Sequence, residues 1–291
     1  MSDQWPKSST VYDYAVDTDS NTAAAHVIKM VGCGKDVLEL GAGPGSISKV
    51  LAERASCRIT AVELDPSCRD SLAAFADRVI IADLNKDDFF AELRGKMFDV
   101  IIVADVLEHL YDPWSLLPKI AALLRPTGSI VCSLPNASHA AILGCLASND
   151  FDYRDWGLLD RTHIRFFGIR NIQAMFEEAG FYVHAAAFVT FAPEQTEFAE
   201  IWKRLSEEER ACFQLGEFSH VYQTVVDARL APSSPPAHAL KLKDMAPPKK
   251  ILPLMYRLGG TTNRHTNFVI QTARRWLPMR VKSVLKRLSG W

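Results

Sequence analysis

The sequence predicts an α/β fold built on a doubly wound, parallel sheet, and three features predict it. Short apolar runs rich in Val and Ile alternate with segments whose apolar residues have helical spacing. A glycine-rich loop follows the first run directly, and acidic residues stand at the ends of the next two. The composition, 48% hydrophobic and 23% charged over 291 residues, excludes a collagen-like, coiled-coil or fully disordered chain.

Five apolar runs are expected as buried strands, because each is short and continuous rather than alternating. They are residues 36–40, 58–64, 78–82, 98–104 and 129–134. Helices are expected between them at 46–54, 66–76, 87–93 and 113–124. The pairs Asp65-Pro66 and Asp112-Pro113 each place a capping carboxylate before a proline, which is typical of a helix start.

The second half of the chain follows a different pattern. Residues 135–168 form a long segment, and a helix at 170–179 ends before Gly180. Strands are expected at 181–188 and 221–228, with an acidic helical insertion at 193–218 between them. The predicted organisation is an N-terminal cap at 1–35, a main domain at 36–230, a Pro-rich linker at 231–248 and a basic amphipathic tail at 249–291.

The first strand leads directly into Gly41-Ala42-Gly43-Pro44-Gly45-Ser46. Glycines there let the backbone turn tightly and approach a ligand at the carboxyl edge of the sheet. Ser46 occupies the position where dinucleotide-binding loops need Gly or Ala, and no P-loop lysine follows. Glu63 and Asp83 end the next two strands, where carboxylates can accept hydrogen bonds from ribose hydroxyls and an adenine amino group. The pattern favours a ligand with ribose, adenine and a cationic amine but no phosphate, over a purely structural turn.

The chain carries, in order, the motifs DVLELGAGPG, AVELDP, ADL, FDVIIVADVLEHL and LLRPTGSIVCSLPN. With them, residues 12–229 resemble the class I S-adenosylmethionine-dependent methyltransferases. The resemblance implies a seven-stranded, mostly parallel Rossmann-like sheet with one antiparallel strand, and S-adenosylmethionine as the cofactor. By position, it assigns cofactor contacts to Glu39, Gly41, Ala42, Gly43 and Gly45 at the methionine part, to Glu63 and Leu64 at the ribose, to Asp83 and Leu84 at the adenine, and to the Ala104 carbonyl at the amine.

In that fold the segment after the fifth strand usually covers the methyl group. Here it contains FDYRDWGLLDRTHIRFFG and resembles bacterial glycan and small-molecule O-methyltransferases, and more loosely quinone-pathway O-methyltransferases. The resemblance implies methyl transfer to a hydroxyl of a sugar or lipid-linked glycan of cell-surface polysaccharide synthesis. Two alternatives stay open: O- or N-methylation of a quinone-like phenol or another secondary metabolite, and a cofactor-binding scaffold without activity.

Transfer to oxygen needs positioning and the removal of one proton, and a histidine suits the second task. His163 is the candidate base, with Asp160 and Arg161 expected to orient it or the acceptor. Acceptor contacts are expected from the side chains of His139, Tyr153 and Trp156. The alternative is that His163 packs in the core and Arg161 pairs with a nearby acid.

A divalent ion is the less favoured interpretation of the same region. Asp105, Glu108 and His109 share one side of a helical turn, and some methyltransferase families resembling this one use such a set, with a distant histidine, to hold an ion. His163 would be that histidine here. Because the Leu-Glu-His sequence is widespread in metal-free relatives and Asp105 replaces the usual glutamate, no metal is expected.

The charges divide the chain into an acidic body and a basic C-terminal stretch. Residues 232–291 hold twelve Lys or Arg and one acid, which suits contact with the inner face of a membrane or docking on the acidic body. The six cysteines show no CxxC spacing, and neither a signal peptide nor a spanning segment is expected. The protein is therefore expected in the cytoplasm, without a nucleic-acid partner, and its oligomeric state is left open.

Overall fold

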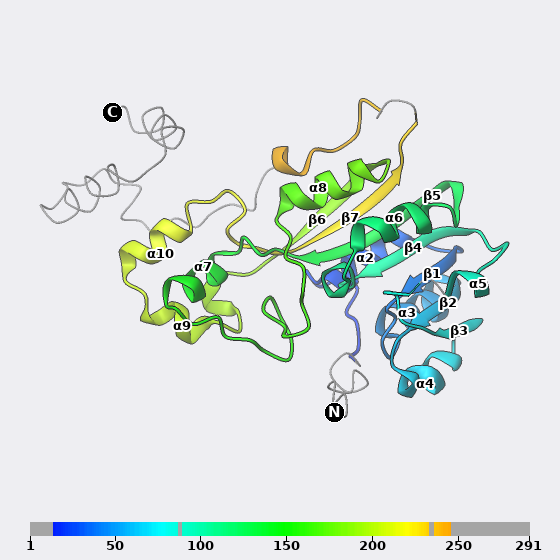
Figure 1. Ribbon diagram of the computed structural model, residues 1–291, viewed down its shortest axis with the longest axis horizontal. Helices are drawn as coiled ribbons and strands as arrows, with labels where there is room; N and C mark the ends of the chain where they lie inside the picture. Colours follow the sequence, from blue (N-terminus) through cyan, green and yellow to red (C-terminus); the bar gives the residue numbers. More distant parts are fainter. Residues whose placement is uncertain (1–13, 87–88, 233–235, 246–291) are drawn as a thin grey trace, which may run out of the picture. The chain divides into compact units, whose positions relative to one another are not determined.

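The structure is a computed structural model that describes residues 14–86, 89–232 and 236–245. These residues form a seven-stranded sheet with strand order β3-β2-β1-β4-β5-β7-β6 (Figure 1). The strands are β1 Asp36–Leu40, β2 Arg58–Glu63, β3 Arg78–Ile81, β4 Phe98–Ala104, β5 Leu124–Pro135, β6 Phe181–Thr190 and β7 Val221–Leu230.

The sheet is parallel except for β7, which runs antiparallel to both of its neighbours, β5 and β6. The strand order reverses between β1 and β4, so the loops after these two strands diverge at the carboxyl edge. This topological switch point is where open α/β sheets bind ligands. The predicted seven-stranded, mostly parallel Rossmann-like fold is confirmed.

Nine helices are present in the part of the chain that the structure describes. They are α2 Ala23–Val31, α3 Ser46–Ala55, α4 Arg69–Ala73, α5 Phe89–Glu92, α6 Pro113–Ala121, α7 Ala140–Ala147, α8 Ile169–Glu178, α9 Ala199–Arg204 and α10 Glu207–Phe213. Single 3-10 turns occur at η1 Pro66–Cys68, η2 Leu107–His109, η3 Pro193–Gln195 and η4 Leu242–Asp244. Both predicted caps form, since Asp65 accepts from the Ser67 N–H and Asp112 accepts from the Ser115 N–H.

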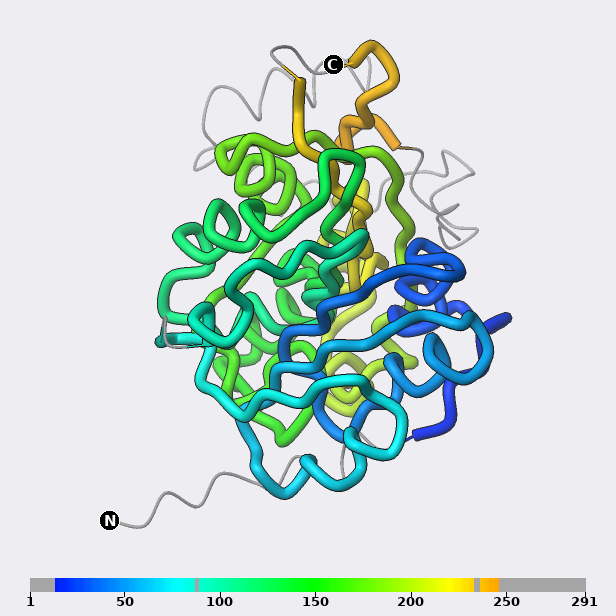
Figure 2. Tube along the Cα trace, turned by 90° about the vertical axis from the view of Figure 1, so that its right-hand side faces the viewer, coloured from blue at the N-terminus to red at the C-terminus, as the bar shows by residue number. Residues whose placement is uncertain are grey.

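The central strands are buried on both faces, which explains their continuous apolar runs, whereas the edge strands β3 and β6 are largely half-buried. In β1, Leu38 and Leu40 belong to one core, while Val37 belongs to the other. Figure 2 shows α2 and α3 on one side of the strands and α6 and α8 on the other. The alternating side chains of a strand point to opposite faces, so both cores are built from the same five parallel strands.

Two predicted helices differ from the observed elements. The helix expected at 66–76 is a 3-10 turn followed by α4, and the one expected at 113–124 ends at Ala121 because β5 begins earlier than expected. The acidic insertion consists of η3, α9 and α10. Helix α7 was not predicted, because its sequence AAILGCLA is apolar all round and carries no amphipathic period.

The segment expected as a linker is packed where the structure describes it. Leu242 is fully buried, and its N–H donates to the Gln173 side chain on α8 at 2.8 Å. The Leu240 N–H donates to the Val183 carbonyl of edge strand β6 at 2.8 Å. Residues 236–245 are therefore a strap across α8 and β6. The predicted basic tail, 249–291, lies outside the described residues, and none of the described helices has the length and apolarity to cross a bilayer.

If the strap is part of the fold, Leu242→Ala destabilises the protein by about 2–4 kcal/mol, because the substitution removes buried methyl groups and leaves a cavity. Lys243→Ala, at the exposed neighbouring position, is the matched control and is expected to change the free energy of unfolding by less than about 0.5 kcal/mol. Urea unfolding followed by circular dichroism measures both. Equal free energies of unfolding for the two variants would show that this segment is a linker and not part of the packed fold.

Candidate functional site

The glycine loop leaves β1 at the carboxyl edge of the sheet, and its conformation requires glycine. Gly41, Gly43 and Gly45 have φ angles of 70°, 55° and 96°, in the left-handed region. A Cβ on Gly41 would lie 2.5 Å from Cγ2 of Val106, and a Cβ on Gly45 would overlap the ring of Phe75. The loop is thus packed against Val106 and Phe75 where side chains would otherwise project. Its backbone atoms are therefore the groups that can contact a ligand.

Glu63 joins this loop to the end of β2. Its Oε2 accepts the Gly43 N–H at 2.7 Å, and its Oε1 accepts the Asp65 N–H at 2.9 Å. The side chain is buried, whereas the following Leu64 is exposed. The structure therefore places the predicted ribose carboxylate within contact of the predicted methionine loop.

Asp83 follows β3 and accepts the Asn85 N–H at 2.9 Å, while its other oxygen lies 3.3 Å from the Lys86 ammonium. Burial alone would raise the pKa of Asp83, but these hydrogen bonds and the positive charge outweigh it and leave the pKa lowered. Leu84 comes next and is half-buried. An ionised carboxylate is therefore available at the position predicted for the adenine.

Glu39 is buried on β1 beneath the loop. The hydroxyl of Ser48, on α3, donates to its Oε2. Burial, with a further contribution from the negative charge of Glu63, raises the pKa of Glu39 to about 7, although the Ser48 hydrogen bond opposes the shift. Among the described residues no lysine or arginine pairs with this carboxylate. A cationic group placed beside it would favour its ionised form.

Tyr14 was missed by the sequence analysis. Its N–H donates to the Ser46 Oγ at 3.2 Å, which places it beside the glycine loop. Burial, followed by the nearby carboxylates of Asp105 and Glu39, raises the pKa of its phenol. A lone tyrosine in a polar N-terminal stretch has no sequence pattern that would mark it as part of the site.

Asp105 follows Ala104 at the end of β4 and has a left-handed backbone, with φ of 51°. Its Oδ1 accepts the Ser133 hydroxyl and its Oδ2 accepts the Gln223 amide, both at 2.8 Å. Burial raises the pKa of Asp105, and both hydrogen bonds oppose that shift. Each oxygen of the carboxylate thus accepts one hydrogen bond, from β5 and from β7, and the negative charge also acts on Glu108 and His109, the next polar groups of the turn.

Those groups form a buried cluster of Glu108, His109 and His163. One ligand atom from each lies within 4.8 Å of the other two, and the His163 Nε2 is 3.8 Å from the Glu108 Oε1. Glu108 has no exposed surface, and among the described residues neither of its carboxyl oxygens has a hydrogen-bond partner. Burial, followed by the charge of Asp105, raises its pKa well above the ordinary value. A buried carboxyl group without partners is costly and calls for an explanation.

Hydrogen bonds assign the tautomer of both histidines. The Nδ1 of His163 lies 3.3 Å from the Leu158 carbonyl, which can only accept, so this nitrogen carries the proton. The Nδ1 of His109 faces the Thr162 carbonyl at 3.2 Å and also the Thr162 hydroxyl oxygen. That hydroxyl donates its own proton to Asp160 at 2.6 Å, so Nδ1 of His109 must be the donor to both Thr162 oxygens. Both rings therefore keep a lone pair on Nε2.

Both imidazoles are held neutral. Burial, followed by the neighbouring His109, lowers the pKa of His163 to about 4, and burial likewise lowers the pKa of His109. Neutral imidazoles with free Nε2 lone pairs and a carboxylate are a donor set for a divalent transition metal ion. The cluster brings together three of the four residues in the predicted metal set and leaves out Asp105.

The residues expected to orient His163 act elsewhere. Asp160 accepts hydrogen bonds from Thr162, and Arg161 is exposed and paired with Asp155 at 2.9 Å. The Leu158 carbonyl orients His163 instead, because the tight turn at 157–163 brings this carbonyl under the ring. The Arg161 side chain does not orient His163, and a contact of Arg161 with the acceptor stays a prediction. Asp160 makes its hydrogen bonds to Thr162 and acts on His163 through its charge.

His139 was also assigned wrongly. It is fully buried, its Nε2 donates to the Phe191 carbonyl at 3.0 Å, and its Nδ1 accepts the Ala141 N–H as the N-cap of α7. Both ring nitrogens are used by the backbone, so His139 has none left for an acceptor. Tyr153 and Trp156 are more than half exposed and remain predicted acceptor contacts.

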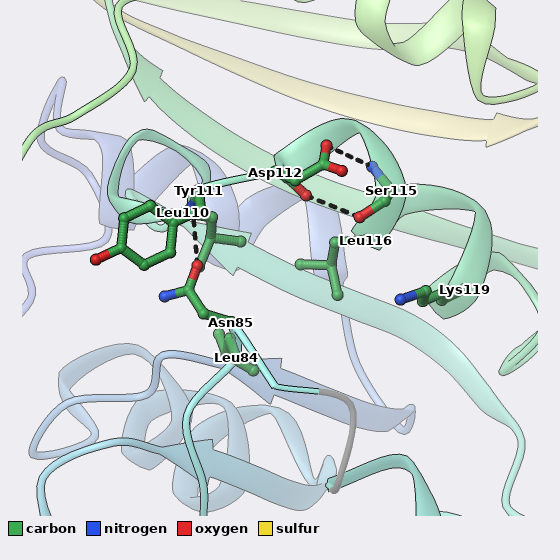
Figure 3. A pocket seen from close by; sticks show the side chains of 8 residues that line it. All are labelled: Leu84, Asn85, Leu110, Tyr111, Asp112, Ser115, Leu116 and Lys119. Atoms are coloured by element: carbon green, nitrogen blue, oxygen red, sulfur yellow. Dashed lines mark hydrogen bonds between the residues drawn. The ribbon is translucent and has the colours of Figure 1, made fainter.

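A separate pocket lies between the loop after β3 and the start of α6 (Figure 3). It is lined by Leu84, Asn85, Leu110, Tyr111, Asp112, Ser115, Leu116 and Lys119. The Asn85 side-chain oxygen accepts the Tyr111 N–H at 2.8 Å and ties its two walls together. Of the predicted cofactor contacts only Leu84 belongs to it, so this pocket borders the expected adenine end and not the buried cluster.

Comparison with known proteins identifies the family of the chain. Residues 23–186, more than half of the chain, match a protein family described as a methyltransferase domain. The chain is 28% identical over 171 residues to the ubiquinone biosynthesis O-methyltransferase of Aeromonas salmonicida, covering 57% of this chain and 70% of that protein. It is 25% identical over 183 residues to the protein of the same name from Coxiella burnetii, covering 62% and 77%.

Among solved structures, a candidate methyltransferase from Bacillus halodurans aligns with a TM-score of 0.50 at 16% identity. The alignment covers 71% of this chain and 97% of that one. At this identity the similarity supports the fold alone.

The Glu39 carboxyl gives a pH prediction. Because its pKa is about 7 in the free protein, a bound ammonium group must displace a proton from it at lower pH. Affinity for S-adenosylmethionine, the cofactor expected from the sequence, should rise with pH by up to about tenfold per unit below pH 7, then level off. Calorimetry in buffers of different ionisation enthalpy measures both affinity and proton release. Glu39→Gln should bind more weakly with a flat profile; a flat profile for the wild type would contradict the assignment.

Proposed function

Because the chain belongs to the methyltransferase domain family and is an S-adenosylmethionine-dependent methyltransferase, we propose that it transfers the methyl group to a hydroxyl oxygen of a small molecule. The observation that carries the proposal is the buried Glu108–His109–His163 cluster, which follows β4 at the same edge as the glycine loop. A site for activating an acceptor hydroxyl belongs there, beside the methyl donor.

The chain's own residues have distinct tasks in such a transfer. The glycine loop, with Glu63 held on the Gly43 N–H, fixes the position of the donor. Glu39 stabilises the donor's ammonium group through its carboxylate. Because the sulfonium is already an activated leaving group, what remains is to align the acceptor oxygen and to withdraw its proton.

The structure favours an ion site over a simple base at His163. A histidine with a pKa of about 4 is a weak base near neutral pH, and its Nε2 faces Glu108 rather than open space. The unpartnered Glu108 carboxyl and the two Nε2 lone pairs fit a divalent ion such as Mn²⁺, Fe²⁺ or Zn²⁺. When bound, such an ion polarises a coordinated hydroxyl and lowers its pKa. The sequence analysis favoured no metal, so this proposal reverses its preference.

The role of the cluster separates into two measurable parts. We expect His163→Ala to lower kcat by about 10²–10⁴-fold, because the acceptor loses its activating group. Affinity for S-adenosylhomocysteine should stay near wild type, because His163 lies outside the glycine loop. His26→Ala, at a half-buried histidine on α2, is the control.

Chelation of the wild type is the second experiment. Prior chelation should abolish wild-type activity, and added Mn²⁺ should restore it. Full activity after chelation would return His163 to the role of base, and full activity of His163→Ala would make it structural.

The comparisons favour a phenolic acceptor. The curated relatives carry the name ubiquinone biosynthesis O-methyltransferase, which suits the quinone-like phenol that the sequence analysis left open as an acceptor. The exposed rings of Tyr153 and Trp156, on the segment that holds His163, can stack on such a ring or on a sugar. The sugar or lipid-linked glycan favoured by the sequence analysis gains no support from these relatives and becomes the second candidate.

The acceptor class can be decided with simple compounds. The protein with labelled S-adenosylmethionine is incubated with phenols that carry two adjacent hydroxyls, with monohydroxy phenols as matched controls, and with hexose glycosides. We expect methylation of the dihydroxy phenols, because two oxygens side by side can share one divalent ion. Methylation confined to the glycosides would support the polysaccharide proposal. Cofactor binding without transfer to any acceptor would favour the scaffold alternative.

Contact of the basic C-terminal stretch, residues 232–291, with a membrane stays a prediction. Ten of its twelve Lys or Arg lie beyond Pro248, and each can gain about 1 kcal/mol near an anionic leaflet, so full-length protein should sediment with anionic vesicles. A chain that ends at Pro248, after the strap, should sediment less, and neutral vesicles are the control. Equal sedimentation of both chains would exclude the tail as a membrane contact.

A further inference from the structure

Asp105 has an unusual backbone at a critical position. It is one of three non-glycine residues with a left-handed φ in the part of the chain that the structure describes. The other two, Ser56 and Asn149, directly follow the helical turns of α3 and α7. Asp105 instead ends the central strand β4, at the switch point of the sheet. A left-handed aspartate is strained, so the surrounding structure must hold it there.

Three hydrogen bonds hold it. The Asp105 N–H donates to the Ser133 carbonyl at 3.1 Å, and the Ser133 hydroxyl donates to Oδ1 at 2.8 Å. The Gln223 amide donates to Oδ2 at 2.8 Å. Ser133 is buried on β5 and Gln223 lies on β7, so the turn is anchored to two neighbouring strands. These anchors occupy both carboxylate oxygens.

The same turn positions groups on two sides of the site. Val106, the next residue, packs directly on the glycine loop, where its Cγ2 leaves no room for a Cβ on Gly41. Leu107 is fully buried in the core and fixes the direction of the η2 turn. Glu108 and His109 follow and enter the buried cluster. A change at Asp105 would therefore be transmitted to both the glycine loop and the cluster.

We propose that Asp105 is a positioning residue shared by the cofactor loop and the ion site, and that its carboxylate binds neither ligand. The left-handed turn that Ser133 and Gln223 stabilise sets Val106 against Gly41 and directs Glu108 and His109 into their cluster. The part that concerns the ion rests on the proposed function. It also differs from the less favoured metal set considered in the sequence analysis, which contained Asp105, because the ligand group that the structure assembles does not include it.

The experiment compares substitutions that separate the carboxylate from the turn. Asn tolerates the left-handed region, and its amide can keep both anchors if the Gln223 amide turns over, so Asp105→Asn is the conservative variant. Asp105→Ala keeps neither. Ser133→Ala combined with Gln223→Leu leaves Asp105 in place and removes the side-chain anchors, which keeps the test valid if Asp105→Ala does not fold.

Two affinities are measured by calorimetry, one for S-adenosylhomocysteine and one for Mn²⁺. Mn²⁺ is chosen because it has little preference for the exposed thiols of Cys33 and Cys212. Asp105→Asn should keep both affinities within about threefold of wild type. Asp105→Ala and the double variant should weaken both together by about tenfold, since strain and lost anchors act on one turn.

Two results would overturn the proposal. A loss of Mn²⁺ affinity in Asp105→Asn, with S-adenosylhomocysteine affinity retained, would make the carboxylate a metal ligand. Unchanged affinities in both Asp105→Ala and the double variant would show that the turn needs no anchoring. Absence of Mn²⁺ binding by the wild type would instead refute the ion site of the proposed function. The cofactor affinities would still test Asp105, so the two failures are distinguishable.

Discussion

Four carboxyl groups lie along the carboxyl edge of the central strands, and none pairs with a lysine or arginine among the described residues. They belong to Glu39, Glu63, Asp105 and Glu108. Taking carboxylates out of water without positive partners is unfavourable, and the raised pKa values of Glu39, Asp105 and Glu108 express that cost. Asp105 is stabilised by the Ser133 hydroxyl and the Gln223 amide. For Glu39 and Glu108 the positive charge is expected from the ligands, namely the ammonium group of the cofactor and a divalent ion.

The fold produces this edge through simple rules. Parallel strands buried on both faces are mostly apolar, so buried carboxyl groups are found near the ends of the strands. Reversal of the strand order between β1 and β4 separates the two following loops, and the glycine loop leaves on one side while the Asp105 turn leaves on the other. Val106 on Gly41 keeps the two in contact. Cofactor loop and ion cluster are thus neighbours because two adjacent strands end there.

The parts predicted from sequence depend on local patterns. The ends of β1 and β2, at Leu40 and Glu63, and the glycine loop after β1 follow from apolar runs and glycine spacing, and they were predicted to within one residue. The contact between His109 and His163 joins residues 54 positions apart, and only the folded turn at 157–163 makes it. The resemblance had placed these two histidines in the less favoured metal set, whereas the use of both His139 nitrogens by the backbone has no sequence pattern. The strap at 236–245 resembled a linker because its Pro-rich composition concealed the single buried side chain, Leu242.

The central claim is that Glu108 is kept in the core for a positive ligand and at a cost to the free protein. The most direct test is the melting temperature of wild type and Glu108→Met, with and without Mn²⁺, at mildly alkaline pH. Without the ion, the methionine variant should melt higher, by about 2–4 °C for each kcal/mol recovered, because an apolar side chain of similar size replaces a buried carboxyl without partners. Mn²⁺ should raise the melting temperature of the wild type and not that of the variant. A variant that melts lower than wild type without the ion, together with no effect of Mn²⁺ on either protein, would contradict the claim.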